Sequence, residues 1–239
     1  MADCLVSFLI PSRGQPELLQ KCVDTIVNNC TGGRAFEILI AIDEDDTQTI
    51  ALIPILQDLT QIHQKPGACT LRTVVTPHKG YARLHEYYNE LAAMSSGELL
   101  ALWNADVVMV SPMWDFFLGQ EVAMQPATLM WIPQEMWWNA QRGYRLFSGG
   151  FPIIHRKAYE AMGHFSQSPL NDRYLHDVMG RFAGMSHDRS YLSRVCIHHD
   201  NSHATNYEAA KPLLSRHNEV LIQNHIKADR EALSSNGLL

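Results

Sequence analysis

Long apolar runs, a basic surplus and paired cysteines are all missing from this chain of 239 residues. The longest apolar runs, at residues 38–42 and 99–103, are far too short to cross a bilayer. Lysine and arginine number 19 against 25 aspartates and glutamates, which is not the balance typical of nucleic-acid binders. The five cysteines are odd in number and form no CxxC pair, so we expect reduced thiols.

Targeting and zinc signals are missing too. The amino-terminal residues carry no basic segment before the first apolar run, so we interpret them as mature protein and not as a signal peptide. The histidines show neither an HExxH motif nor the spacing of a structural zinc site. We therefore expect a cytoplasmic protein that has no transmembrane segment and does not bind nucleic acid.

Apolar strands and amphipathic helices alternate over the first 107 residues. We expect strands at 5–10, 36–42, 71–75 and 99–103, and helices at 17–29, 49–62 and 83–94. This order predicts an α/β fold with a mainly parallel central sheet flanked by helices. In the less regular second half we expect helices at 156–162, 169–182 and 209–233, strands around a tight turn at 149–150, and a strand at 191–198. Neither a repeat nor a linker is visible, which predicts a single domain over residues 1–239.

Polar residues follow three of the predicted strands. The first strand leads into Pro11, Ser12 and Arg13, the second ends at Asp43, and the fourth leads into Asn104 and Asp106. Parallel strands end at one edge of a sheet, where ligands bind, so these residues predict a binding site. Arg13 can pair with a phosphate, and Asp106 offers the oxygen ligand that Mg²⁺ or Mn²⁺ prefers. The alternative is that Asn104 and Asp106 are ordinary turn residues.

Two neighbouring groups have both a functional and a structural interpretation. Asp43 could accept hydrogen bonds from a base or a ribose, whereas Asp45 and Asp46 fit the cap of the next helix better. Lys79 and Arg83 lie near a predicted helix start, where they could bind phosphates or form a solvated face.

The second half supplies candidates for a metal ligand and a general base. Neutral imidazole is a common metal ligand. His198 is the first candidate for this role, and His199 and His203 are weaker ones. Asp172 opens a predicted helix and Asp177 lies on a different face of it, so only one of them is expected to face a site. A first-turn carboxylate such as Asp172 also favours the helix dipole, which is the structural alternative.

The joint order of these pieces resembles the family 2 glycosyltransferases of GT-A fold. The resemblance covers residues 4 to about 200 and is carried by VSFLIPSRGQPELLQKCVDTI, FEILIAIDEDD, KGYARLHEYYNELAAMSSGELLALWNADV and SGGFPIIHRKAYEAMGHFSQSPLNDRYLHDVMGR. Two positions depart from the family's pattern. Asn104 stands where the first aspartate of an Asp-x-Asp metal motif is usual, and Asn171 precedes Asp172 where a Glu-Asp pair is usual.

The resemblance implies transfer of a sugar from a nucleotide diphosphate sugar to an acceptor hydroxyl, with inversion. On this basis residues 1–107 bind the donor, where Asp43 meets the base and Arg13 or Arg83 assists the diphosphate. Asp106 holds Mn²⁺ or Mg²⁺, and His198 falls where some GT-A enzymes place a further ligand.

The resemblance assigns residues 108–239 to the acceptor, which could be a glycan, a lipid or a small molecule. Asp172 takes the role of general base, with Asp177 in reserve, and Gly149 and Gly150 form a turn on the acceptor side. The tryptophans of the second half could line a sugar or belong to the core; they are Trp131, Trp137 and Trp138.

Two other functions fit parts of the sequence. A sugar-phosphate nucleotidyltransferase shares the strand and helix order, but it usually has a glycine-rich basic loop after the first strand, and here only Gly14 follows it. A non-catalytic nucleotide-sugar or glycan-binding protein of the same fold is compatible with Asn104 in the metal motif.

Overall fold

The computed structural model describes residues 4–62, 69–135, 146–147, 150–179, 189–199 and 216–239. Its first half alternates strands with helices. The strands are β1 (Cys4–Ser12), β2 (Ala35–Asp43), β3 (Cys69–Thr76) and β4 (Leu99–Leu102). The connecting helices are α1 (Pro16–Asn28), α2 (Thr47–Ile62) and α3 (Leu84–Met94), with the short 3-10 turn η1 (Tyr81–Arg83) before α3. The predicted elements of this half are confirmed, including α2 despite Pro54 inside it.

Shorter strands and further helices make up the second half. The strands are β5 (Val107–Met109), β6 (Met130–Glu135), β7 (Leu146–Phe147), β8 (Ile153–His155) and β9 (Arg189–His199). The helices are α4 (Trp114–Met124), α5 (Arg156–Met162), α6 (Asn171–Val178) and α8 (Arg216–Ser235). The sequence analysis did not predict β5, α4 or β6. It placed α6 at 169–182, whereas the helix begins at Asn171 and ends at Val178, followed by Met179 in a turn. It started α8 at 209, in a segment outside the described residues.

One sheet contains all of these strands, in the order β3-β2-β1-β4-β8-β6-β9-β5, with β7 paired to β6. The long pairings of β1 with β2 and of β2 with β3 are parallel, as is the pairing of β1 with β4. Strand β8 then runs antiparallel to both β4 and β6, and β9 runs parallel to β6 but antiparallel to β5. The fold is a mixed α/β domain with a mostly parallel sheet, and the predicted fold class is confirmed.

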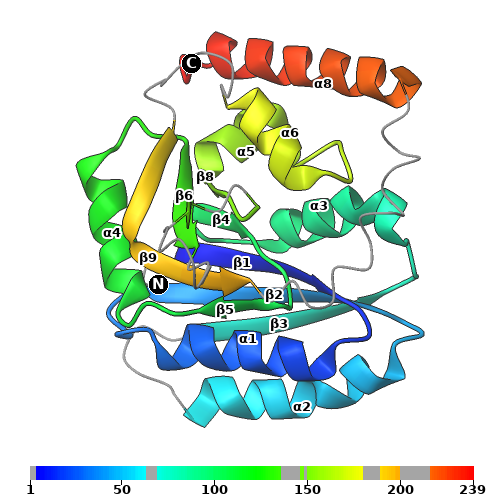
Figure 1. Cartoon of the computed structure of the whole chain (residues 1–239), viewed down its shortest axis with the longest axis vertical. Helices are drawn as coiled ribbons and strands as arrows, with labels where there is room; N and C mark the ends of the chain where they lie inside the picture. Colours follow the sequence, from blue (N-terminus) through cyan, green and yellow to red (C-terminus); the bar gives the residue numbers. More distant parts are fainter. Residues whose placement is uncertain (1–3, 63–68, 136–145, 148–149, 180–188, 200–215) are drawn as a thin grey trace, which may run out of the picture.

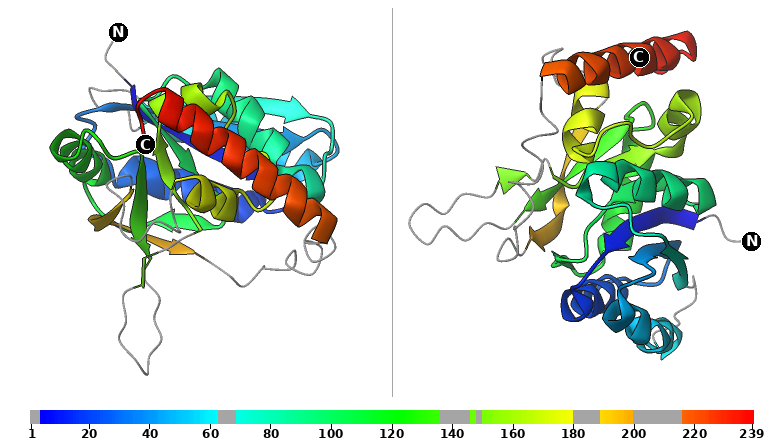
Figure 2. Two further views of the ribbon diagram at one scale, coloured as in Figure 1. Left: turned by 90° about the horizontal axis from the view of Figure 1, so that it is seen from above. Right: turned by 90° about the vertical axis from the view of Figure 1, so that its right-hand side faces the viewer.

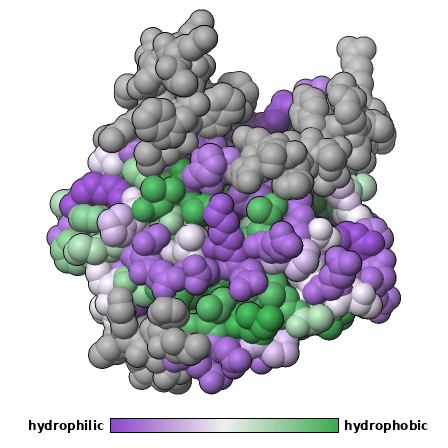
Figure 3. All heavy atoms as spheres, turned by 60° about the horizontal axis from the view of Figure 1, so that its bottom comes forward, coloured by the Kyte–Doolittle hydropathy of each residue, from purple (hydrophilic) through white to green (hydrophobic). Residues whose placement is uncertain are grey.

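Helices cover both faces of this sheet. Helices α1 and α2 lie together on one face, and α3 lies on the other, where α5, α6 and α8 continue away from the sheet (Figures 1 and 2). Strands β1 and β2 are buried over almost their whole length because both of their faces are covered, which explains their continuous apolar sequence. In the view of Figure 3, hydrophilic surface is broken by smaller hydrophobic areas.

The polar network under α3 fixes the turn that precedes β4. Glu37 of β2 is only 3% exposed, and its Oε1 accepts hydrogen bonds from the Ser7 hydroxyl at 2.6 Å and from the Gly97 amide at 3.3 Å. The amide of Ser96 and the guanidinium of Arg72 complete its contacts. Gly97 sits so close to β1 that an added Cβ would lie 2.6 Å from the Ser7 hydroxyl and 2.7 Å from the Ser7 nitrogen.

Helix α8 packs on α5 and α6 at the far side from α1 and α2 (Figure 1). Its inward stripe contains Ile226, Asp229 and Leu233, spaced for one face of a helix, while Val220 and Leu221 are exposed. None of the helices among the described residues is long and apolar enough to cross a membrane.

Candidate functional site

The carboxyl ends of β1 and β2 bring Arg13 to a pair of aspartates. Its Nη1 lies 2.8 Å from Oδ2 of Asp43, and its Nη2 lies 2.9 Å from Oδ2 of Asp45. These hydrogen bonds to Asp45 and Asp43 raise the pKa of the Arg13 side chain, which therefore stays charged. The predicted meeting of these loops is present, but the guanidinium is already committed to two carboxylates.

Asp43 is 3% exposed and binds three partners at once. Besides Arg13, its carboxylate contacts Nδ1 of His78 at 2.7 Å and accepts the hydroxyl proton of Tyr87. Burial, together with the hydrogen bond to Asp43, raises the pKa of Tyr87 to about 12, so this phenol remains a donor at neutral pH. A carboxylate has about four acceptor positions, so Asp43 keeps room for one more donor.

Asp46 caps α2 as predicted, whereas Asp45 does not. The Oδ1 of Asp46 accepts from the Thr49 amide at 3.2 Å, and its Oδ2 accepts from the Gly14 amide at 2.6 Å. Burial acts to raise the pKa of Asp46, but the hydrogen bonds from Thr49 and Gly14 outweigh it and the pKa is lowered. Asp45 turns instead to the Arg13 guanidinium, which lowers its pKa.

Asn104, just past β4, is held by a buried tyrosine. The Tyr88 hydroxyl lies 2.7 Å from Oδ1 of Asn104 and 3.0 Å from the carbonyl oxygen of Trp103. Tyr88 itself is 1% exposed and stacks on Phe165 at a centroid distance of 5.8 Å. The amide of Asn104 is therefore part of a packed network.

Asp106 pairs with His199, and not with the predicted His198. Strand β9 runs antiparallel to β5, where Val107 lies opposite His199 and Val108 opposite His198. Because side chains alternate along a strand, only His199 points toward Asp106, and its Nε2 lies 3.2 Å from Oδ2 of Asp106. His198 is exposed, and His203 lies outside the described residues.

Asp172, in the first turn of α6, contributes to the pKa shifts of two tyrosines. Burial, followed by the carboxylates of Asp172 and Asp106, raises the pKa of Tyr88 well above its ordinary value. Burial and Asp172 likewise raise the pKa of Tyr81. Asp106 and Asp172 therefore both act electrostatically on one buried hydroxyl.

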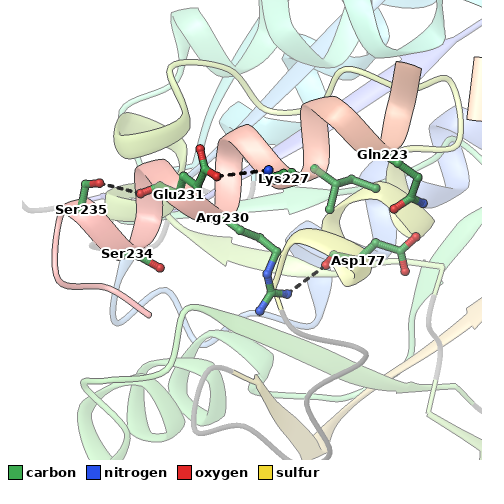
Figure 4. Close-up of a pocket in the computed structure, with 8 residues that line it drawn as sticks. Asp177, Gln223, Lys227, Arg230, Glu231, Ser234 and Ser235 are labelled. Atoms are coloured by element: carbon green, nitrogen blue, oxygen red, sulfur yellow. Dashed lines mark hydrogen bonds and ion pairs between the residues drawn. The ribbon is translucent and has the colours of Figure 1, made fainter. Parts of the chain in front are cut away.

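Asp177 lies on the side of α6 that faces α8. It lines a hollow of about 650 Å³ beside α8, together with Gln223, Lys227 and Arg230 (Figure 4). Its carboxylate lies 3.6 Å from the guanidinium of Arg173. Asp172 and Asp177 lie five positions apart on α6, about 140° around the helix, so they lie on different faces. Which of the two is a base stays a prediction.

The other predicted binding residues are more dispersed. Lys79 pairs with Glu90 and lies over the Tyr87 ring, and Arg83 forms a bidentate pair with Glu86 at 2.5 and 2.6 Å. Among the remaining ones, Pro11 and Ser12 end β1, Gly150 is half-buried beside Phe151, and Gly149 lies outside the described residues. Trp131 is fully buried in β6 and belongs to the core; Trp137 and Trp138 lie outside the described residues.

Two places in the described part of the chain could hold a cation. The Oδ1 of Asp106 is buried and has no hydrogen-bond partner there, so a cation beside it and His199 would satisfy an otherwise unpaired oxygen. The second place is the cluster of Asp43, Asp45 and His78, whose ligand atoms lie within 4.8 Å of one another. There a cation would have to displace or neighbour the Arg13 guanidinium, so Asp106 fits Mn²⁺ or Mg²⁺ better.

The sequence analysis missed the tyrosines and His78. Tyr81 and Tyr88 are seven residues apart and Tyr87 precedes the latter, which in sequence is indistinguishable from the apolar stripe of a core helix. The available signal was their chemistry, because a buried tyrosine hydroxyl usually finds a polar partner. His78 lies in a loop after β3, at the same sheet edge as Asp43, and its position alone made it a candidate.

The fold of this protein is similar to those of solved structures, although comparisons of its sequence found no match. No protein-family profile matches the chain, and no curated protein matches it. The fold is similar to residues 1–349 of TarS from S. aureus in complex with UDP, with a TM-score of 0.65 at 10% identity over 94% of this chain. The match spans 65% of that TarS chain, slightly under two thirds.

Two further structures are similar over most of the chain. The mannosyltransferase PcManGT from Pyrobaculum calidifontis, in complex with GDP-Man and Mn²⁺, has a TM-score of 0.64 at 14% identity over 99% of this chain and 77% of its own. Glucosyl-3-phosphoglycerate synthase from Mycobacterium tuberculosis, in complex with phosphoglyceric acid, has a TM-score of 0.57 at 13% identity over 83% and 72%. Identities this low carry the fold and not the activity. The chain therefore has the GT-A glycosyltransferase fold.

Proposed function

We propose that this protein is a glycosyltransferase that moves a sugar from a nucleotide diphosphate sugar to an acceptor hydroxyl. The observation that carries the proposal is the Asp106–His199 pair at the strand-end edge of a GT-A fold. Asp106 and Asp172 also both raise the pKa of the buried Tyr88, which supports a role for them in one site. Two of the similar structures hold UDP or GDP-Man, which supports a nucleotide diphosphate sugar as the donor.

Asp106 and His199 are the residues that would hold Mn²⁺ or Mg²⁺. When bound, such an ion stabilises the negative charge that grows on the leaving diphosphate. Asp43 accepts a hydrogen bond from the base or ribose at its remaining acceptor position, and Arg13 is oriented beside it. Asp172 takes the proton of the acceptor hydroxyl, whose oxygen bonds to the anomeric carbon while the bond to the diphosphate breaks. A single displacement of this kind inverts the anomeric centre.

A non-catalytic nucleotide-sugar binder of the same fold is the second candidate. Its support is that Asn104 is tied to Tyr88, and that Arg13, Lys79 and Arg83 are each paired with a carboxylate. Such a site offers a diphosphate less uncommitted positive charge than three unpaired cations would. Turnover separates this candidate from the enzyme.

The first test is thermal unfolding with a panel of nucleoside diphosphates and their sugars, with and without Mn²⁺. A ligand at a hundredfold its dissociation constant stabilises the native state by about 2.7 kcal/mol. We expect one nucleoside diphosphate to stabilise the protein in a metal-dependent way, and Asp106→Asn to remove the metal-dependent part. The exposed Asp58→Asn on α2 is the matched control and keeps the shift.

Release of nucleoside diphosphate in the presence of acceptor panels is the second test. We expect Asp172→Asn to slow transfer about 10²–10⁴-fold while it retains donor binding. If no nucleotide stabilises the wild type under any metal condition, the proposal fails. If nucleotides bind but no acceptor is ever modified, the non-catalytic candidate replaces it.

A further inference from the structure

Helix α8 carries a buried carboxylate in the middle of its docking stripe. Asp229 is 5% exposed and lies between the buried apolar residues Ile226 and Leu233. A buried carboxylate is costly unless it is paired and hydrogen-bonded, so its partners indicate what it is for. Those partners come from α6 and from the turn after α5.

The partners of Asp229 lock it to two other segments. Its Oδ2 accepts the hydroxyl proton of Tyr174 in α6, and its Oδ1 lies 3.1 Å from Nε2 of His164. Burial and the Asp229 carboxylate raise the pKa of Tyr174, which therefore stays protonated and keeps donating. Tyr174 is 1% exposed, so this contact is shielded from competing water.

A second contact joins the same two helices at the carboxyl end of α6. Nη1 of Arg230 donates to the backbone carbonyl oxygens of Asp177 and Val178 at 3.3 and 3.2 Å, as Figure 4 shows for Asp177. These are carbonyls that the helix itself leaves unpaired, and a cation there also favours the helix dipole. Neighbouring residues of α8 thus hold α6 at its side and at its end.

The other end of α6 follows a loop held by α3. The side chain of Asn89 accepts from the amides of Phe165 and Ser166 at 2.8 and 3.0 Å and donates to the Ser166 carbonyl at 2.8 Å. Asp172 and Tyr174 are two residues apart and point about 200° apart around the helix. With Tyr174 fixed against α8, Asp172 lies on the other side of α6, from which it raises the pKa of Tyr81 and Tyr88.

We propose that Asp229 and Tyr174 are positioning residues, through which α8 holds α6 so that Asp172 faces the reacting centre. This inference rests on the proposed function for its catalytic consequence. It adds that α8 contributes to the acceptor side by holding α6 in place, although none of its residues touches the reacting atoms.

Hydrogen exchange tests the mechanical part without any turnover. In Asp229→Asn and in Tyr174→Phe, we expect amides of Asn171–Val178 to exchange at least about tenfold faster than in the wild type, while those of β1 and β2 are unchanged. Glu231→Gln removes a charge from the exposed side of the same helix and serves as the matched control. Unchanged exchange of α6 in both variants would overturn the proposal.

A double-mutant cycle with Asp172→Asn tests the catalytic part. We expect Asp229→Asn to lower kcat at least about tenfold with the donor KM and the nucleotide dissociation constant unchanged, and to cause no further loss in the Asp172→Asn background. Independent losses that multiply would overturn the role through Asp172. If the wild type binds no nucleotide and transfers no sugar, the proposed function fails, and hydrogen exchange alone then decides whether α8 holds α6.

Discussion

The buried and half-buried carboxylates of this protein differ in how fully their oxygens are paired. Glu37 and Asp43 each collect several donors, and Asp115 is fully buried with hydrogen bonds from the amide and hydroxyl of Thr31. Asp106 is different, because one of its oxygens contacts His199 while the other is buried without a partner among the described residues. Unpaired buried oxygens are uncommon, so this contrast supports our proposal that Asp106 has a functional role.

Glu37 provides a prediction about pH at the scale of one side chain. Burial acts to raise its pKa, but the hydrogen bonds from Ser7 and Ser96 and the contact with Arg72 outweigh it, so the folded pKa is lowered. A lowered folded pKa means that the stabilisation is present above the unfolded pKa of about 4.3 and is lost as the pH falls through the folded value. We expect Glu37→Gln to cost about 2 kcal/mol at pH 7.

Urea unfolding at several pH values between 7 and 3 measures this. The difference in unfolding free energy between wild type and Glu37→Gln should shrink as the pH falls below about 4.3. The exposed Glu231→Gln should track the wild type throughout. A difference that stays constant down to pH 3 would show that the charge on Glu37 does not matter.

At the scale of elements, the first half was predictable because its strands are buried on both faces and its helices are amphipathic. The predicted strands and helices there correspond to β1 through β4, with the helices between them. The partner of Asp106 was left open by the sequence. Because side chains alternate along β9, His199 and not His198 points toward Asp106. The choice between His198 and His199 could not be made from the sequence, because it depends on the register between β9 and β5, which lie about 90 residues apart in the chain.

Two elements that the sequence analysis did not predict, β5 and α4, have no clear hydrophobic period. Strand β5 is only three residues long, and α4 buries Trp114 and Asp115 side by side, so neither shows a clean period. Asp115 accepts a hydrogen bond from the amide of Thr31 in the loop after α1, and the Trp114 indole donates to the carbonyl of Ile26 at 2.8 Å. Contacts to a distant loop, and not local periodicity, determine this helix.

Replacement of glycine by alanine should have opposite effects on the unfolding free energy at Gly97 and at Gly119. A Cβ at Gly97 would meet backbone and side-chain atoms of Ser7 within 2.8 Å, so β1 and the turn before β4 would have to separate. We expect Gly97→Ala to lower the unfolding free energy by about 1–3 kcal/mol through overpacking. A Cβ at Gly119, inside α4, would meet only ordinary contacts at 3.6 and 3.9 Å.

Gly119→Ala is therefore the control for the same substitution. We expect it to raise the unfolding free energy by about 0.5–1 kcal/mol, since glycine weakens a helix interior relative to alanine. Chemical denaturation of both variants checks the pair of signs. A stable Gly97→Ala protein would mean that the close approach of the two segments relaxes without cost.

At the scale of the whole molecule, the expected single domain remains a prediction, and α8 offers the means to test it. Leu233 is fully buried where α8 docks, whereas Leu221 on the same helix is 51% exposed. We expect Leu233→Ala to cost about 2–5 kcal/mol of unfolding free energy, as large-to-small core changes do. Leu221→Ala should stay within about 0.5 kcal/mol of the wild type.

Tryptophan fluorescence makes this a test of cooperativity, because Trp103, Trp114 and Trp131 are buried around the central sheet and not under α8. If the chain unfolds as one unit, Leu233→Ala shifts the fluorescence and circular dichroism transitions together. A fluorescence midpoint that stays in place while helix signal is lost earlier would mean that α8 unfolds independently.

The pairing of β5 with β9 also has a consequence for the order in which the protein matures. A chain that emerges from the ribosome has β1 to β4, and thus the parallel half, long before β9 exists, because domains fold from the amino end during synthesis. Asp106 must then wait for a histidine 93 residues downstream. A nascent or truncated chain can therefore possess the loops after β1 and β2 and still lack the Asp106–His199 pair, so the proposed cation site would form only once the whole sheet has closed.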